Sequence, residues 1–154
     1  HHFKDKAELF RAVFEEVERD LTLRSLASPP AGADPWERLT SGLQGFLQAA
    51  SEPEVQRVML VDGPVVLGWQ TLRSIQEGNS IAMIDGVVRE AIAEGIIDNQ
   101  PVRELTHMLV AAVEEASLLV AHASRPTAAR KRAAQVLDRM LLSFAVNPGN
   151  MLRR

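Results

Sequence analysis

Apolar residues recur every three or four positions along almost the whole chain, a spacing typical of one face of an α-helix. Asp5 and Glu8 resemble a capping box, and an apolar series at helical spacing runs from Leu9 to Leu21. Two prolines and a glycine within residues 28–32 then predict the end of this first helix. Asp34-Pro35 predicts a second start, because an acidic residue caps a helix and proline suits its first turn.

The middle of the chain predicts further helices with breaks between them. A helix restarts at residues 51–54, and we expect an interruption at Asp62-Gly63-Pro64. Proline removes a backbone donor and disfavours helical geometry in the residue before it. A longer helix is expected after Gly68-Trp69, loosened at Gly78.

The last part of the chain predicts two long helices, one over residues 100–123 and one that begins at Pro126. Both carry seams of small and apolar residues, which let helices approach closely in hairpins and bundles. We expect them to form a four-helix bundle with a second chain, a homodimer. The expected interface residues are Leu105, Leu109, Ala112, Ala116, Leu119, Ala133, Val136 and Met140. Packing of both seams within one monomer is the alternative.

No alternating strand pattern of useful length interrupts these helices, so the sequence predicts an all-α domain of about six helices. Hydrophobic residues make up 46% of the 154 residues and charged residues 24%, as in globular proteins. No apolar run approaches the ~20 residues that cross a bilayer, so we expect a cytoplasmic protein without a membrane partner. The formal net charge of −3 disfavours nucleic-acid binding through a broad basic surface.

The sequence also lacks the patterns that enzymes and metal sites need. There is no cysteine, and no pair of the four histidines has the His-x-x-x-His spacing of a helical metal site. Glu114 and Glu115 are adjacent, so on a helix they point about 100° apart and do not converge. We therefore expect no catalytic activity, no cofactor and no metal.

One polar face suggests a binding site for a small molecule. Arg103, His107 and Glu114 fall opposite the small-residue seam and could fix the polar end of a ligand in an apolar pocket. Further expected lining residues are Phe46, Met59, Trp69, Leu72 and Met83. A solvated polar face and an ordinary apolar core are the alternatives for these two sets.

Three short segments resemble the tetracycline-repressor family of transcriptional regulators. Residues 1–10, HHFKDKAELF, are similar to the junction between the DNA-reading helix and the helix that links it to the ligand-binding domain. Glu94-Gly95-Ile96-Ile97-Asp98, followed by a proline and an Ala/Leu-rich helix, resembles the entry to the family's dimerisation hairpin. Asp62-Gly63-Pro64 with Leu67-Gly68-Trp69 resembles a signature of one branch of its C-terminal domains.

The resemblance implies that residues 1–4 end a DNA-binding domain, 5–147 bind ligand and dimerise, and 148–154 form a tail. Lys6 and His2 match positions that contact DNA phosphates, so operator DNA is expected as a partner of the full-length protein only. The resemblance further implies a repressor that a small, largely apolar effector releases from DNA. A helical protein-interaction module without a small-molecule ligand is the alternative function.

Overall fold

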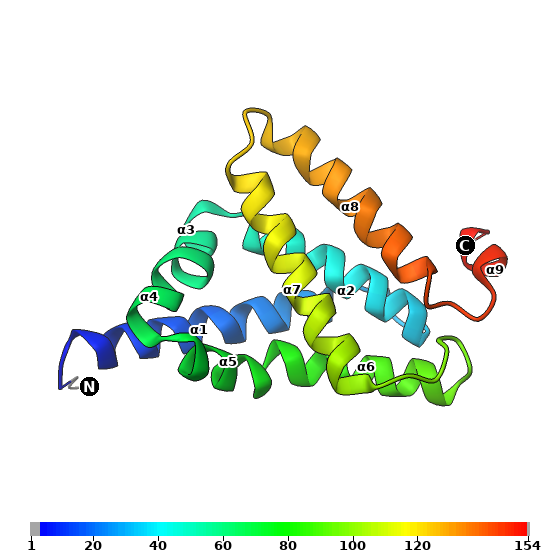
Figure 1. Cartoon of the computed structure of the whole chain (residues 1–154), viewed down its shortest axis with the longest axis horizontal. Coiled ribbons are helices and arrows are strands. Elements are labelled where there is room, and N and C mark those ends of the chain that lie inside the picture. Colours follow the sequence, from blue (N-terminus) through cyan, green and yellow to red (C-terminus); the bar gives the residue numbers. More distant parts are fainter. Residues whose placement is uncertain (1–3, 154) are drawn as a thin grey trace.

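The structure, a computed structural model, describes residues 4–153, and Figure 1 shows that their regular elements are helices. In chain order they are α1 (Lys6–Ala27), α2 (Pro35–Ala50), α3 (Pro53–Gln56), the π-helix η1 (Arg57–Asp62), α4 (Gly63–Leu67), α5 (Trp69–Glu77), α6 (Ser80–Ala93), α7 (Val102–Ala121), α8 (Pro126–Leu142) and α9 (Pro148–Leu152). Six of these helices in the described part of the chain have nine residues or more, namely α1, α2, α5, α6, α7 and α8. The predicted all-α fold of about six helices is confirmed.

The first two helix starts are capped as the sequence predicts. The Glu8 backbone N–H donates to Asp5 Oδ1 over 2.8 Å, and the Glu37 N–H donates to Asp34 Oδ1 over 2.9 Å. Each acid accepts one of the N–H groups that a first helical turn leaves without a partner. Pro35 follows the second cap at the start of α2, where its missing donor is not needed.

The buried face of α1 is rotated from the one that the apolar series predicts. Leu9 and Val13 are 46% and 41% exposed, whereas Phe14, Glu18 and Leu21 are buried. The face of α1 that packs in the core therefore contains Phe14 and Leu21, with the acidic residue Glu18 between them. Simple apolar spacing could not identify this face, because Glu18 does not count as apolar.

The expected break at Asp62-Gly63-Pro64 is wrong. The chain passes from η1 into α4 without leaving helical geometry, and the Gly63 N–H donates to the Val58 carbonyl, five residues back. This wider π-helical turn ends at Pro64, which lies in the first turn of α4 and needs no donor there. The break lies instead at Gly68, whose φ of 77° favours glycine.

α1 packs against α2 and α6, while α7 contacts α2, α6 and its hairpin partner α8. In Figure 1, α7 crosses in front of α1 and α2, and α8 runs back beside it toward the C-terminal end. The loop before α7 and the loop after α8 are joined by an antiparallel bridge between Ile97 and Ala145, with the Val146 N–H donating to the Ile96 carbonyl over 2.9 Å.

The predicted tail contains the short helix α9, and its Met151 is partly buried against the core. Across the described residues, no helix combines the length and the apolar character that a membrane span requires.

Candidate functional site

Five side chains from four helices form a polar group in the interior, which we call the buried polar cluster: Glu18 of α1, Arg73 and Gln76 of α5, Ser80 of α6 and Glu114 of α7. Glu18 accepts from the Ser80 backbone N–H over 3.1 Å and from the Ser80 hydroxyl. Gln76 Nε2 donates to Glu114 Oε1 over 2.6 Å. Glu18, Gln76 and Ser80 are each at most 1% exposed, so the bonds between Glu18 and Ser80 are buried, while the bond to Glu114 is partly buried.

Arg73 supplies the positive charge of the cluster. It lowers the pKa of both Glu18 and Glu114, which places its guanidinium within electrostatic reach of the two carboxylates. The same guanidinium lies 5.4 Å from the centre of the Trp69 ring, a cation–π distance. Trp69 is 66% exposed and Arg73 is partly buried, so the ring is the more exposed member of this contact.

Burial dominates the ionisation of both acids. It raises the pKa of Glu18 to about 7, against the hydrogen bonds from Ser80, which lower it. Burial also raises the pKa of Glu114, and the hydrogen bond from Gln76 and the charge of Arg73 partly oppose the rise. Two carboxylates that resist ionisation in one buried site are unusual, and such groups concentrate at functional sites.

Of the ligand-site residues predicted from the sequence, only Trp69 and Glu114 lie at this cluster. Arg103 lies at the surface, where its Nη2 is 3.2 Å from Glu77 Oε1, and His107 Nε2 lies 3.8 Å from the same oxygen. The Arg103 side chain is 69% exposed. The predicted polar face of α7 is therefore divided, with Glu114 turned into the cluster and Arg103 paired outside it.

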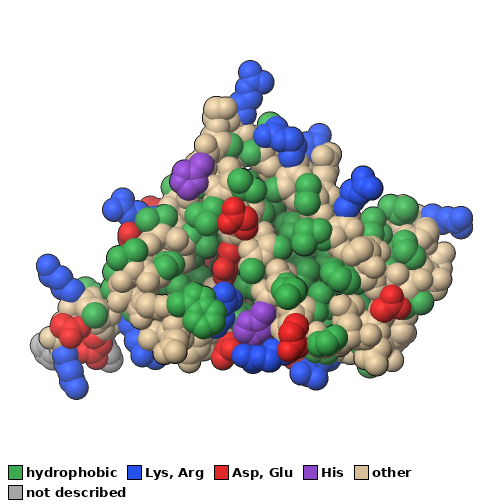
Figure 2. Space-filling model, in the orientation of Figure 1, with side chains coloured by type: hydrophobic (Ala, Val, Ile, Leu, Met, Phe, Trp, Pro, Cys, Tyr) green, Lys and Arg blue, Asp and Glu red, His purple; other side chains and the backbone are tan. Residues whose placement is uncertain are grey.

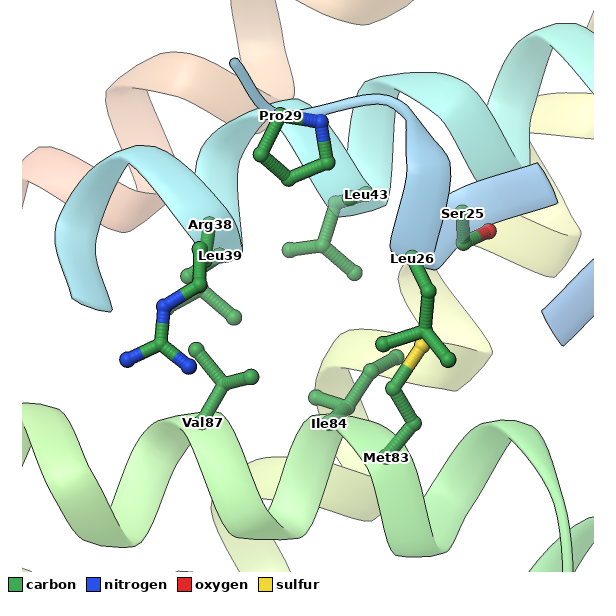
Figure 3. Close-up of a pocket in the computed structure, with 10 residues that line it drawn as sticks. Ser25, Leu26, Pro29, Arg38, Leu39, Leu43, Met83, Ile84 and Val87 are labelled. Carbon is green, nitrogen blue, oxygen red and sulfur yellow. The ribbon is translucent and has the colours of Figure 1, made fainter. Parts of the chain in front are cut away.

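The predicted apolar lining does not form one pocket either. Phe46, Met59 and Leu72 are buried members of the main core. Met83 lies instead at a small cavity of about 50 Å³ between the end of α1, α2 and α6, which Figure 3 shows with Leu26 and Val87 on its walls. Ligand pockets are usually about 300–1,000 Å³, so this cavity is too small for a typical effector. Arg38 stands at its rim and pairs with Glu90 over 2.6 Å.

A larger apolar groove of about 500 Å³ runs between α7 and α8. Figure 2 shows hydrophobic side chains gathered over these two helices. Among its lining residues, Leu119 is 62% exposed, Val136 59% and Met140 40%. The other predicted interface residues in this groove are Ala112, Ala116 and Ala133.

Leu105 and Leu109 depart from the predicted interface. They are 6% and 2% exposed and belong to the core of the single chain, so they have little surface left for a second copy. The seam of α7 thus has a buried part, which packs within the chain on α2 and α6, and an exposed part, which lines the groove.

Of the two predicted phosphate contacts, Lys6 is exposed at the first position of α1, and His2 lies outside the described residues.

Four members of the cluster, Glu18, Arg73, Gln76 and Ser80, were not predicted from the sequence. Glu18 did carry a signal, because it stands four residues after Phe14 and three before Leu21, inside a stripe that faces the core. Arg73 and Gln76 flank Leu72 and Ile75 on a short helix, where polar residues are normally assigned to solvent.

The comparisons with known proteins agree with this architecture. Residues 36–144, more than half of the chain, match the sequence model of the tetracyclin repressor-like C-terminal domain. The chain belongs to this family. It is a TetR-like C-terminal domain of the kind found in transcriptional regulators. No curated protein matches the sequence at a significant level.

Two solved structures have the same fold. A TetR-family transcriptional regulator from Pectobacterium atrosepticum is 25% identical, with a TM-score of 0.81 over 95% of this chain and 75% of the relative. A TetR-family transcription regulator described as putative, from Shewanella sp. PV-4, is 18% identical, with a TM-score of 0.72 over 95% of this chain and 78% of the relative. The second likeness concerns the fold alone.

Proposed function

We infer that this TetR-like domain binds a small-molecule effector and forms the dimer of a DNA-binding repressor, without catalysis. The contact between Glu18 and Ser80 carries this proposal. It joins the middle of α1, which resembles the family's linking helix, to the start of α6 through buried polar bonds. A ligand that changes the partners of Glu18 or Arg73 would change the preferred position of α1.

The physical basis is a two-state equilibrium. An effector shifts α1 only if it binds one position of α1 more tightly than the other, and DNA binding must depend on the same two positions. Buried polar groups suit this role, because a lost partner inside the protein costs more than one at the surface. Lys6, exposed at the start of α1, would contact a DNA phosphate in a full-length protein.

The groove between α7 and α8 supports the dimer half of the proposal. Its exposed apolar residues, Leu119, Val136 and Met140, form an unpartnered hydrophobic face on an antiparallel hairpin. A second copy that packs its own hairpin there would bury both faces in a four-helix bundle, an isologous arrangement. Ala112, Ala116 and Ala133 would let the helices approach closely.

The effector role is tested with a set of small organic acids, amines, alcohols and amides, by thermal unfolding and hydrogen exchange. A true effector should raise the midpoint temperature in a saturable way and slow amide exchange around residue 18 of α1 and at the start of α6. If no compound class does so while the chain remains dimeric, the effector role is wrong and a ligand-free interaction module is the better description.

A further inference from the structure

The buried polar cluster contains side-chain atoms that have no hydrogen-bond partner. Six buried side-chain nitrogen or oxygen atoms in the described part of the chain lack one, and four of them belong to the cluster. They are Glu18 Oε2, Gln76 Oε1, and Nε and Nη1 of Arg73. Buried polar atoms are almost always paired, with protein or with another molecule. Four unpaired atoms on three neighbouring side chains therefore point to a bound group.

The four atoms divide evenly between donors and acceptors. Glu18 Oε2, when ionised, and Gln76 Oε1 only accept, whereas the two Arg73 nitrogens only donate. An ammonium group would satisfy the acceptors and leave Arg73 unpaired. A carboxylate would satisfy Arg73 and lie beside two buried acids. Only a group that both donates and accepts can satisfy all four atoms, and water, a hydroxyl and a carboxamide are such groups.

The surroundings favour a ligand over a lone water molecule. Trp69 stacks on Arg73 and is 66% exposed, an unusual position for the largest apolar side chain. Trp69 directly follows Gly68, the residue at which the helical path ends between α4 and α5. Because this exposed ring lies against Arg73, an apolar frame attached to a group at Arg73 would have a surface to cover.

We propose that Glu18, Arg73 and Gln76 bind a neutral hydroxyl or carboxamide group, carried on an apolar frame that packs against Trp69. This proposal rests on the proposed effector function and names the chemical class of the effector. It excludes simple organic cations and anions as the preferred ligands of this site.

The test uses matched probes in a Trp36→Phe background, in which Trp69 is the single remaining tryptophan. The probes are 3-phenylpropanamide, 3-phenylpropan-1-ol, 3-phenylpropanoate and 3-phenylpropylamine, together with the corresponding octyl series. Trp69 fluorescence and thermal unfolding report binding. The amide and the alcohol should bind at least tenfold more tightly than the acid and the amine of the same frame.

Arg73→Met removes the two unpaired donors and keeps an apolar stem against Trp69, so it should weaken amide binding at least tenfold. Arg103→Met is the matched control, because Arg103 is an exposed arginine paired with Glu77 outside the cluster. Its amide affinity should stay within twofold of the parent. Equal loss in both variants, or no loss in Arg73→Met, contradicts the proposal.

The remaining outcomes separate this proposal from the proposed function. Tighter binding of the acid or the amine overturns the ligand class and leaves the effector role intact. If no probe of either frame binds, the four atoms hold water only and the site is not a ligand site. The effector role then fails as well only if the wider compound set also leaves the midpoint temperature unchanged.

Discussion

Glu18 caps the N-terminus of α6 from the middle of α1, through the Ser80 backbone N–H at 3.1 Å and the Ser80 hydroxyl. The residue in the cap position of α6, Asn79, makes no side-chain cap and instead donates to the Ile75 carbonyl over 2.9 Å. A carboxylate is favourable at a helix N-terminus, where the N–H groups and the helix dipole attract negative charge. Complete burial opposes that ionisation, and the balance leaves the pKa of Glu18 at about 7.

The first prediction concerns the pH dependence of stability. The folded-state pKa of Glu18, about 7, is above its ordinary value of 4.5, so folding favours the protonated acid. The stabilisation is complete below pH 4.5 and is lost as pH rises through 7. Linkage at about 1.4 kcal/mol per pH unit gives a loss of roughly 2–3 kcal/mol in unfolding free energy between pH 5 and 8.

Glu18→Gln should remove most of this slope, because glutamine still accepts from Ser80 and does not ionise. Urea unfolding at several pH values measures the effect. Glu16→Gln is the control, since Glu16 is an exposed acid of α1 paired with Arg19 at the surface. Glu114 and Arg73 face Glu18 in the cluster, and the pKa of Glu114 is also raised, so a slope from Glu114 should remain. An unchanged slope in Glu18→Gln would place the titration elsewhere.

The second prediction concerns the bond between Gln76 and Glu114. Gln76→Leu removes the donor that lowers the pKa of Glu114, so the pKa of Glu114 should rise further. A buried acid that loses its donor is destabilised by about 1–3 kcal/mol, and the loss should grow as pH rises from 5 to 8, because a raised pKa of Glu114 opposes its ionisation.

Gln70→Leu provides the comparison, because Gln70 is an exposed glutamine of the same helix. Its unfolding free energy should change by less than about 0.5 kcal/mol at both pH values. Equal effects of the two substitutions would mean that the bond to Glu114 contributes nothing specific.

The sequence predicted the parts of the fold that follow from local signals. Asp5, Asp34 and the prolines at helix starts have the roles that capping chemistry assigns to them. The break expected at Asp62-Gly63-Pro64 was wrong because a π-helical turn brings Pro64 into the first turn of α4, where its missing donor is not needed, and this depends on how Gly63 packs. No local pattern reports such a compensation.

The site was less predictable than the fold for a related reason. Glu114 and Trp69 were identified by helical spacing and by residue type, but their partners come from other helices. Glu18 and Ser80 are 62 residues apart in the chain, and only tertiary packing brings them together. Spacing on one helix also could not divide the α7 seam between Leu109, in the core, and Leu119, at the surface.

The third prediction tests the groove between α7 and α8. Leu119→Glu places a charge on a side chain that is 62% exposed in the single chain, so the monomer fold should tolerate it. In a four-helix bundle the same charge would be buried without a partner, and dimerisation should weaken by at least tenfold. Sedimentation velocity over a concentration series measures the change.

Leu23→Glu is the matched control, since Leu23 on α1 is 58% exposed and lies outside the groove. It should leave the oligomeric state unchanged. Val136→Glu, on the opposite wall of the groove, should repeat the effect of Leu119→Glu. A soluble dimer that survives both groove substitutions would rule out this interface.

The last prediction compares two helical glycines that differ in their surroundings. A Cβ atom at Gly63 would lie 2.7 Å from the Val58 carbonyl oxygen and 2.9 Å from the ring of Phe14, which is fully buried. Neither neighbour can move without disturbing η1 or the core. Gly63→Ala should therefore destabilise the protein by about 1–3 kcal/mol, because an added side chain in a packed site forces its neighbours to shift.

At Gly86, within α6, a Cβ atom meets no atom within 4 Å. Gly86→Ala should stabilise the helix by about 0.5–1 kcal/mol, because alanine loses less backbone entropy than glycine. Thermal and urea unfolding of the two variants should shift in opposite directions. If Gly63→Ala were as stable as Gly86→Ala, the close approach of η1 to Phe14 would be wrong, and with it the explanation for the helical path through Pro64.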